Sequence, residues 1–115
     1  MFINQGDVFW VRLPDDPEPH LPHPYVIIQN NALNHTPINT VVACALTSNL
    51  NRISLAGNVL IEAGEANLSR HSVVEVSKAI TLEKADLGEY IGTVSEGRIA
   101  QILAGIRFVQ SFLPL

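Results

Sequence analysis

Short apolar runs, separated by turn-forming residues, occupy most of the chain before residue 95. Runs that are rich in β-branched and aromatic residues predict β-strands. The predicted strands cover residues 7–13, 25–28, 40–46, 59–61 and 72–76, and one helical turn is predicted over 65–68. The run over 25–28 is too apolar to have a face in water, so we expect that strand to be buried on both faces.

The last part of the chain changes period. From Ile99 to Leu113, apolar residues recur every three or four positions, which predicts an amphipathic helix. Ser95 is the predicted N-cap, and the helix should end before Pro114. Strands followed by one helix predict a mainly β fold, in which a small, strongly curved sheet or barrel of five or six strands packs against a C-terminal helix.

A proline-rich segment joins the first two predicted strands. Residues 14–24 contain five prolines and can form neither a helix nor a central strand. Loops of this length are often functional. His20 and His23, with Asp15 and Asp16 upstream, offer nitrogen and oxygen ligands, but an extended backbone points residues three apart to opposite faces. We therefore expect no metal site and no cofactor.

Composition narrows the class of protein. The chain has 115 residues, of which 47% are hydrophobic and 16% charged, so one folded domain over residues 1–115 is expected. The single cysteine, Cys44, lies in an apolar run and predicts a buried thiol in a reducing compartment. No leader pattern or membrane-spanning run is present, which predicts a cytoplasmic protein without membrane contact.

The net charge of −4 lacks the basic surplus that is typical of proteins that bind nucleic acid. Part of this charge lies in one loop, which holds Asp15, Asp16 and Glu18. Without those three carboxylates the balance would be −1, so the acidity of the whole chain does not describe every surface of it.

Five short motifs occur in order along the chain, and none is a phosphate-binding loop, a hydrolase elbow or a zinc ribbon. They are residues 6–11 (GDVFWV), 23–30 (HPYVIIQN), 46–50 (LTSNL), 72–74 (SVV) and 87–92 (LGEYIG), followed by the final helix. In this order and spacing the chain resembles the MazF/PemK family of toxin endoribonucleases over nearly its whole length.

The resemblance implies an SH3-like, CcdB/PemK-like β-barrel of five to seven strands with a C-terminal helix. It also implies a toxin of a type II toxin–antitoxin system that cleaves single-stranded RNA without a metal, leaving a 2′,3′-cyclic phosphate and a 5′-hydroxyl end. The implied partners are RNA, a cognate antitoxin and a second copy of the chain, with no direct contact to DNA.

The same resemblance points to catalytic residues. In the family, a threonine at the end of the third strand acts with an arginine that precedes the second-strand proline. Thr47 matches the threonine and Ser48 lies beside it, whereas His23 occupies the arginine position. Histidine, with an ordinary pKa near 6.5, can accept a proton but lacks the permanent forked charge of a guanidinium. His23 therefore fits either a working proton carrier or a homologue that has stopped cleaving.

The basic residues Arg52, Arg70 and Lys78 are candidates for RNA binding, or else scattered solubilising charges. Lys78 falls where the family often has glutamine, so it keeps a charge for phosphate but loses amide hydrogen bonds to bases. Trp10 lies in a strand that is apolar on both faces and is expected in the core or in a dimer interface.

Two non-catalytic readings share the same fold. One is a degenerate homologue that only binds an antitoxin-like peptide, or a CcdB-type inhibitor of DNA gyrase, although the chain lacks the terminal Trp-Gly-Ile of that type. The other is an interaction module whose apolar tail seals a homodimer through Phe108, Phe112, Leu113 and Leu115.

Overall fold

The computed structural model describes residues 2–15 and 21–111. The expectations for Asp16, Glu18, His20, Phe112, Leu113 and Leu115 concern positions outside this part of the chain. The elements, in chain order, are β1 (Asp7–Val11), β2 (His23–Ile27), α1 (Asn31–Asn34), β3 (Thr40–Thr47), η1 (Leu50–Ser54), β4 (Val59–Ile61), η2 (Glu65–Asn67), β5 (Ser72–Glu83), η3 (Lys84–Asp86), β6 (Leu87–Thr93) and α2 (Glu96–Gln110).

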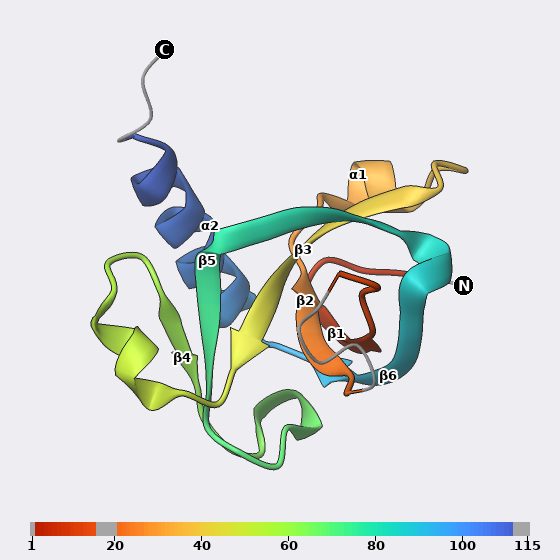
Figure 1. Ribbon diagram of the computed structural model, residues 1–115. Coiled ribbons are helices and arrows are strands. Elements are labelled where there is room, and N and C mark those ends of the chain that lie inside the picture. The colour runs from red at the N-terminus through yellow and green to blue at the C-terminus, as the bar shows by residue number, and fades with distance from the viewer. Residues whose placement is uncertain (1, 16–20, 112–115) are drawn as a thin grey trace.

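The strands form one antiparallel sheet in the order β4-β5-β3-β2-β1-β6. Figure 1 shows how strongly this sheet curls, with β5 crossing the molecule before the chain turns down into β6. The prediction of a mainly β fold with a C-terminal helix is therefore confirmed. The word barrel describes only the curvature, because the edge strands β4 and β6 do not pair and the sheet stays open.

Both faces of the sheet are buried, which explains why the strands are so apolar. One core includes Val8, Val26 and Val74 and packs against Ile102 of α2. The other lies inside the curl of the sheet and consists of Ile3, Phe9, Val11, Tyr25, Ile27, Val41, Ala43, Leu82 and Leu87. Consecutive strand residues alternate between the two cores, as the two-residue period of a strand requires.

Cys44 lies on the helix side of the sheet and is fully buried, as predicted. Burial raises the pKa of its thiol to about 12, because the thiolate would lose its hydration. Cys44 is therefore a neutral packing residue.

Helix α2 confirms the predicted stripe and cap. Ser95 accepts a hydrogen bond from the backbone N–H of Arg98, and Ile102 is the most deeply buried residue of the stripe. The Arg98 guanidinium binds Glu65 of η2 through two nitrogens, at 3.0 Å and 2.9 Å. We call this pair the Glu65 clamp. It fastens the start of the helix to the connection before β5.

Several elements differ from the prediction. Strand β1 ends at Val11 and not at residue 13, and β6 lies outside the predicted strands. Strand β2 begins at His23, because its first two residues pair only with β1 and proline is tolerated at such a position. Strand β5 continues past residue 76 to Glu83, and the loop predicted after residue 31 opens with the short helix α1. The exposed polar residues Ser77 and Lys78 hid the second half of β5 from the apolar pattern.

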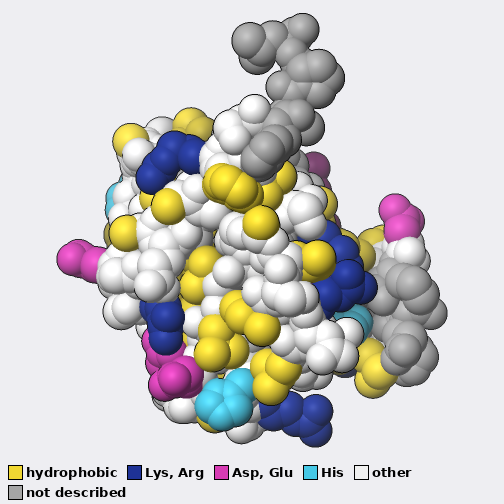
Figure 2. Space-filling view, turned by 90° about the vertical axis from the view of Figure 1, so that its left-hand side faces the viewer, with side chains coloured by type: hydrophobic (Ala, Val, Ile, Leu, Met, Phe, Trp, Pro, Cys, Tyr) yellow, Lys and Arg dark blue, Asp and Glu magenta, His cyan; other side chains and the backbone are white. Residues whose placement is uncertain are grey.

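Hydrophobic side chains are exposed on the side of the molecule formed by η1 and α2. They include Leu50, Ile53 and Leu55 of the η1 region and Phe108 of α2, each between 44% and 48% exposed. Figure 2 shows such side chains scattered over this face between polar groups. Among the described residues, no helix is long and apolar enough to cross a membrane.

Candidate nucleic-acid interface and active site

A cavity of about 740 Å³ opens where the end of β3 meets the starts of β2 and β5. Of the residues proposed from the sequence, five line it: His23, Thr47, Ser48, Arg70 and Lys78. The remaining one, Arg52, reaches the cavity through an ion pair with Glu75, which also lines it. The structure thus gathers residues that are 55 positions apart in the chain, from His23 to Lys78, around one space.

Strand pairing explains why His23 and Thr47 are neighbours. Strands β2 and β3 are antiparallel, with Tyr25 opposite Ala45. The pairing of these strands ends at that pair, and the same register carried two residues further points the ends of both strands, at His23 and Thr47, toward each other. His23 is the first residue of its strand and Thr47 the last of its own, so both lie at a sheet end that opens onto the cavity.

The hydroxyl of Thr47 has one role in the turn that follows. Its oxygen accepts a hydrogen bond from the backbone N–H of Asn49 at 3.2 Å. Because a hydroxyl also carries a donor proton, this contact leaves Thr47 able to donate to a group in the cavity. Ser48, the next residue, is exposed and lies at the edge of the same space.

An irregularity in β5 shapes the opposite wall. Leu46 pairs with Val74, but Cys44 pairs with Ala79, so residues 75–78 all lie opposite the single residue Ala45. Bulges of this kind bend a strand and re-aim its side chains, and they are common beside active sites. Here the bulge brings Glu75 and Lys78 to the cavity.

Glu75 is the functional candidate that sequence reasoning missed. It is only 5% exposed, and it lies in a run of buried residues that looked like ordinary strand. Its carboxylate faces two cations: Lys78 Nζ lies 3.3 Å from one oxygen and Arg52 Nε 3.7 Å from the other. A signal was present, since a charge between valines in a buried strand is rarely tolerated without partners.

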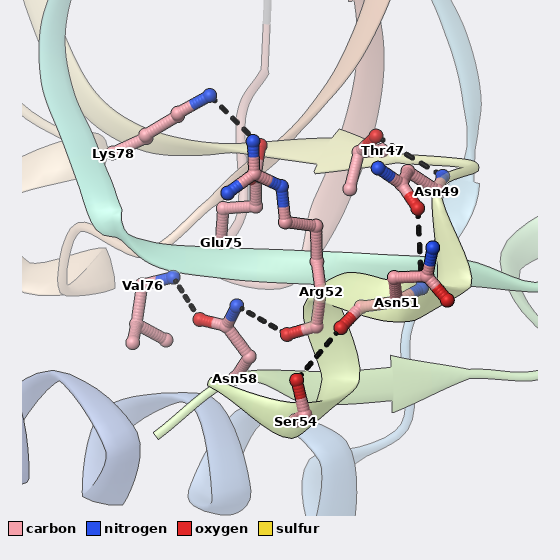
Figure 3. Close-up of polar contacts among 9 residues, drawn as sticks. All are labelled: Thr47, Asn49, Asn51, Arg52, Ser54, Asn58, Glu75, Val76 and Lys78. Atoms are coloured by element: carbon pink, nitrogen blue, oxygen red, sulfur yellow. Dashed lines mark hydrogen bonds and ion pairs between the residues drawn. The ribbon is translucent and has the colours of Figure 1, made fainter. Parts of the chain in front are cut away.

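The loop that carries Arg52 is fixed to the bulge by side-chain amides (Figure 3). Asn58 donates to the carbonyl oxygen of Arg52 at 2.9 Å and accepts from the backbone N–H of Val76 at 3.1 Å. Asn49 caps the start of η1 by accepting from the N–H of Asn51. These contacts hold Arg52 beside Glu75. We call Glu75, Arg52 and Lys78 together the Glu75 cluster.

The charge of the cavity differs from that of the whole chain. Arg70, Lys78 and Arg52 contribute three permanent positive charges, against one negative charge on Glu75. Arg70 is exposed and makes no ion pair with any described residue. A surplus of positive charge in a concave site attracts a phosphodiester chain, so the acidity of the chain as a whole does not prevent RNA binding here.

Trp10 also lines the cavity and is 37% exposed, so it does not lie in the core, and its place in a dimer interface stays a prediction. Its neighbours along β1 are buried, whereas the indole lies at the cavity wall. Within residues 2–15 and 21–111, no three His, Cys, Asp or Glu side chains come together as a metal site.

The chain is similar in sequence to a known protein family. Residues 4–109 match the family model described as PemK-like, MazF-like toxin of type II toxin-antitoxin system. Endoribonuclease MazF2 of Mycobacterium bovis is 32% identical over 95% of this chain and 97% of its own length. Endoribonuclease MazF of Staphylococcus epidermidis is 31% identical over 87% of this chain and 84% of its own.

Solved structures share the fold. A mycobacterial endoribonuclease in complex with its cognate antitoxin superimposes with a TM-score of 0.77 at 24% identity, and the match covers 98% of this chain and 99% of the other. MazF from a MazE–MazF complex of Deinococcus radiodurans gives a TM-score of 0.76 at 14% identity, over 98% and 99% of the two chains.

Proposed function

Because this chain belongs to the PemK-like, MazF-like toxins of type II toxin–antitoxin systems, we propose that it is an endoribonuclease that cleaves single-stranded RNA without a metal. The observation that carries the proposal is that His23, the first residue of β2, and Thr47, the last residue of β3, line one cavity that is rich in positive charge. The products are a 2′,3′-cyclic phosphate and a 5′-hydroxyl end.

Each group in the cavity has a chemical task in this reaction. The ribose 2′-hydroxyl attacks the adjacent phosphorus, and negative charge builds up on the phosphate oxygens. Thr47 and Ser48 donate hydrogen bonds to those oxygens, while Arg70 and Lys78 balance their charge. His23 exchanges a proton with the reacting ribose or the leaving oxygen, because an imidazole can do so near neutral pH.

The histidine at position 23 changes how charge is stabilised. It cannot supply the permanent, forked grip of a guanidinium on phosphate. The cavity contains Arg70, and Arg52 lies at its border beside Glu75, so guanidinium groups are available from other elements. We propose that these arginines take over phosphate binding and leave His23 to transfer protons.

The proposal includes partners and a location. As a toxin of a toxin–antitoxin pair, the protein binds a cognate antitoxin, and we expect it to form a homodimer. The exposed apolar side chains of η1 and Phe108 are suited to such contacts. A cytoplasmic location follows from the RNA substrate and from the unpaired Cys44.

The decisive experiment incubates the purified protein with a long single-stranded RNA in the presence of EDTA and maps 5′-hydroxyl ends. We expect cleavage by the wild type and a loss of about 10²- to 10⁴-fold for His23→Ala and for Thr47→Ala. His35→Ala and Thr81→Ala serve as matched controls, because neither residue lines the cavity. An RNA left intact by the wild type from pH 5 to 9 would refute the enzymatic proposal and favour a binding-only homologue.

His23→Arg tests the departure from the family directly. If the guanidinium at this position mattered only for charge, the variant should cleave faster than the wild type. If His23 transfers a proton, the arginine variant should be slower, because a guanidinium keeps its proton at neutral pH.

A further inference from the structure

We propose that Glu75 is the proton acceptor of the cleavage reaction and that His23 is the proton donor. This inference rests on the proposed function and assigns the two proton transfers that the function requires. It comes from the placement of a buried carboxylate in the cavity wall, across the sheet from His23.

The reaction needs two proton-transfer groups. As the bond from the 2′-oxygen to phosphorus forms, the 2′-hydroxyl proton passes to the Glu75 carboxylate. As the bond from phosphorus to the 5′-oxygen breaks, protonated His23 gives a proton to that oxygen. The products are the cyclic phosphate and the 5′-hydroxyl, and solvent exchange then returns both side chains to their starting states.

The sheet places the two groups on opposite sides of Thr47. Strand β3, which carries Thr47, lies between β2 with His23 and β5 with Glu75. Since neighbouring strands lie about 4.8 Å apart, the outer two are separated by about 10 Å. A phosphorane with one hydrogen bond of about 2.8 Å on each side spans a gap of this order. In-line attack requires this arrangement, with acceptor and donor on opposite sides of the phosphorus.

The bulge places Glu75 near Thr47. Val73 pairs with Thr47, and Glu75 follows two residues later as the first residue of the bulge. Glu75 and Thr47 line the same cavity, where a phosphate could lie between their side chains.

The contacts of Glu75 leave its oxygens available. Its side chain makes two polar contacts with described residues, the ion pairs with Lys78 at 3.3 Å and with Arg52 at 3.7 Å. Neither ion pair is also a hydrogen bond. A purely structural carboxylate at this depth would be expected to accept several short hydrogen bonds. Arg52 from η1 and Lys78 from β5 face the Glu75 carboxylate, and His23 and Arg70 line the same cavity.

The two roles can be separated with a paired substrate. At the bond that the wild type cuts, one RNA carries the normal 5′-oxygen and the other a bridging 5′-sulfur, which leaves as a thiolate without a proton. We expect Glu75→Gln to lose about 10²- to 10⁴-fold on both RNAs. His23→Ala should lose as much on the oxygen RNA but recover most of its rate on the sulfur RNA.

Three results would overturn the assignment: cleavage of the oxygen RNA by Glu75→Gln at the wild-type rate, recovery of Glu75→Gln on the sulfur RNA, or no recovery of His23→Ala. Failure of the wild type to cut either RNA would instead refute the proposed function. Glu83→Gln is the matched control, since Glu83 is exposed at the far end of the same strand.

Two further measurements separate catalysis from folding. Glu75→Gln should bind an RNA with 2′-deoxyribose at the cleaved nucleotide as tightly as the wild type, because the phosphate-binding cations remain. Glu75→Asp keeps the charge beside Arg52 and Lys78 but withdraws the oxygens by one methylene, so it should fold normally and cleave more slowly. If Glu75→Asp cleaved like the wild type while Glu75→Gln lost RNA binding, Glu75 would be a counter-ion for the cations only.

Discussion

Two glutamates, Glu65 of η2 and Glu75 of β5, show how differently a carboxylate can be held. In the Glu65 clamp, the oxygens accept three hydrogen bonds, two from Arg98 at 3.0 Å and 2.9 Å and one from the backbone N–H of Glu62 at 2.8 Å. In the Glu75 cluster, the cations stand at 3.3 Å and 3.7 Å. Yet the side chain of Glu65 is 29% exposed and that of Glu75 only 7%.

The comparison separates structural from chemical use of the same residue type. The clamp satisfies its carboxylate completely in a place where water could also do so, so it fastens α2 at little desolvation cost. The cluster removes its carboxylate from water and pairs it loosely, which lowers the stability of the folded protein. A charge kept at such a cost is expected to serve a function. The less exposed and less tightly bonded glutamate is therefore the better candidate for chemistry.

Charge reversal should give the largest difference in unfolding free energy between the two glutamate positions. In Glu75→Lys, a buried ammonium would face Arg52 and Lys78 without a counter-charge, at a cost of about 3–5 kcal/mol in the free energy of unfolding. In Glu65→Lys, the new charge meets Arg98 where solvent screens it, so the cost should be about 1 kcal/mol or less. Urea denaturation at pH 7 measures both, and equal losses would contradict the difference in burial.

The close packing of α2 at Gly105 should contribute more to the stability of the helix position than the Glu65 clamp does. A Cβ on Gly105 would overlap the carbonyl oxygen of Gly57, so Gly105→Ala should cost about 1–3 kcal/mol of unfolding free energy. A Cβ on Gly97, in the first turn of the same helix, would make only an ordinary contact of 3.8 Å with the Ser95 hydroxyl, so Gly97→Ala should stabilise by about 0.5–1 kcal/mol. Thermal unfolding of the pair checks this, and a destabilised Gly97→Ala would show that the helix start is also crowded.

The salt dependence of RNA affinity tests whether Arg70 of the cavity, and not Arg98 of the clamp, binds phosphate. If Arg70 contacts a phosphate, Arg70→Ala should reduce the slope of log affinity against log salt by about 0.7, the value for one contact on a single strand. Arg98→Ala should leave the slope unchanged, because Arg98 is committed to the clamp. Fluorescence anisotropy with an uncleavable RNA, from 50 to 200 mM salt, measures the slopes. An equal decrease for both variants would mean that RNA binds outside the cavity.

Much of the fold could be predicted because local patterns and packing agree. The apolar runs of β1, β3 and β4 and the stripe of α2 each have one period and one set of buried faces. The second half of β5 could not be predicted in this way. Its exposed polar residues Ser77 and Lys78 belong to the bulge, and a bulge is created by pairing with β3, more than thirty residues earlier in the chain.

The candidate site divides along the same line. His23, Thr47 and Ser48 could be proposed because they end or begin strands and match family motifs in order. Arg70 and Lys78 could be proposed as RNA-binding cations from the sequence. That both line one cavity could not be predicted. Glu75 had a local signal, a charge between two valines, but that signal does not tell a solvent face from a cavity wall, because the bulge decides where the side chain lies.

The smallest expected effect concerns the clamp and pH. Hydrogen bonds from Arg98 hold the pKa of Glu65 below its ordinary value of 4.5. The folded protein therefore binds fewer protons at Glu65 than the unfolded chain does near pH 4, and the stabilisation is present above pH 4.5 and lost as pH falls through the folded pKa. Because the pair is partly exposed, its full size should be below about 1 kcal/mol. Unfolding free energies from pH 3 to 7 should show wild type and Glu65→Gln converging in acid and diverging toward neutrality. Glu89→Gln, at an exposed position without such a clamp, should run parallel to the wild type, and a Glu65→Gln curve that also ran parallel would mean that Arg98 gives no preference to the charged carboxylate.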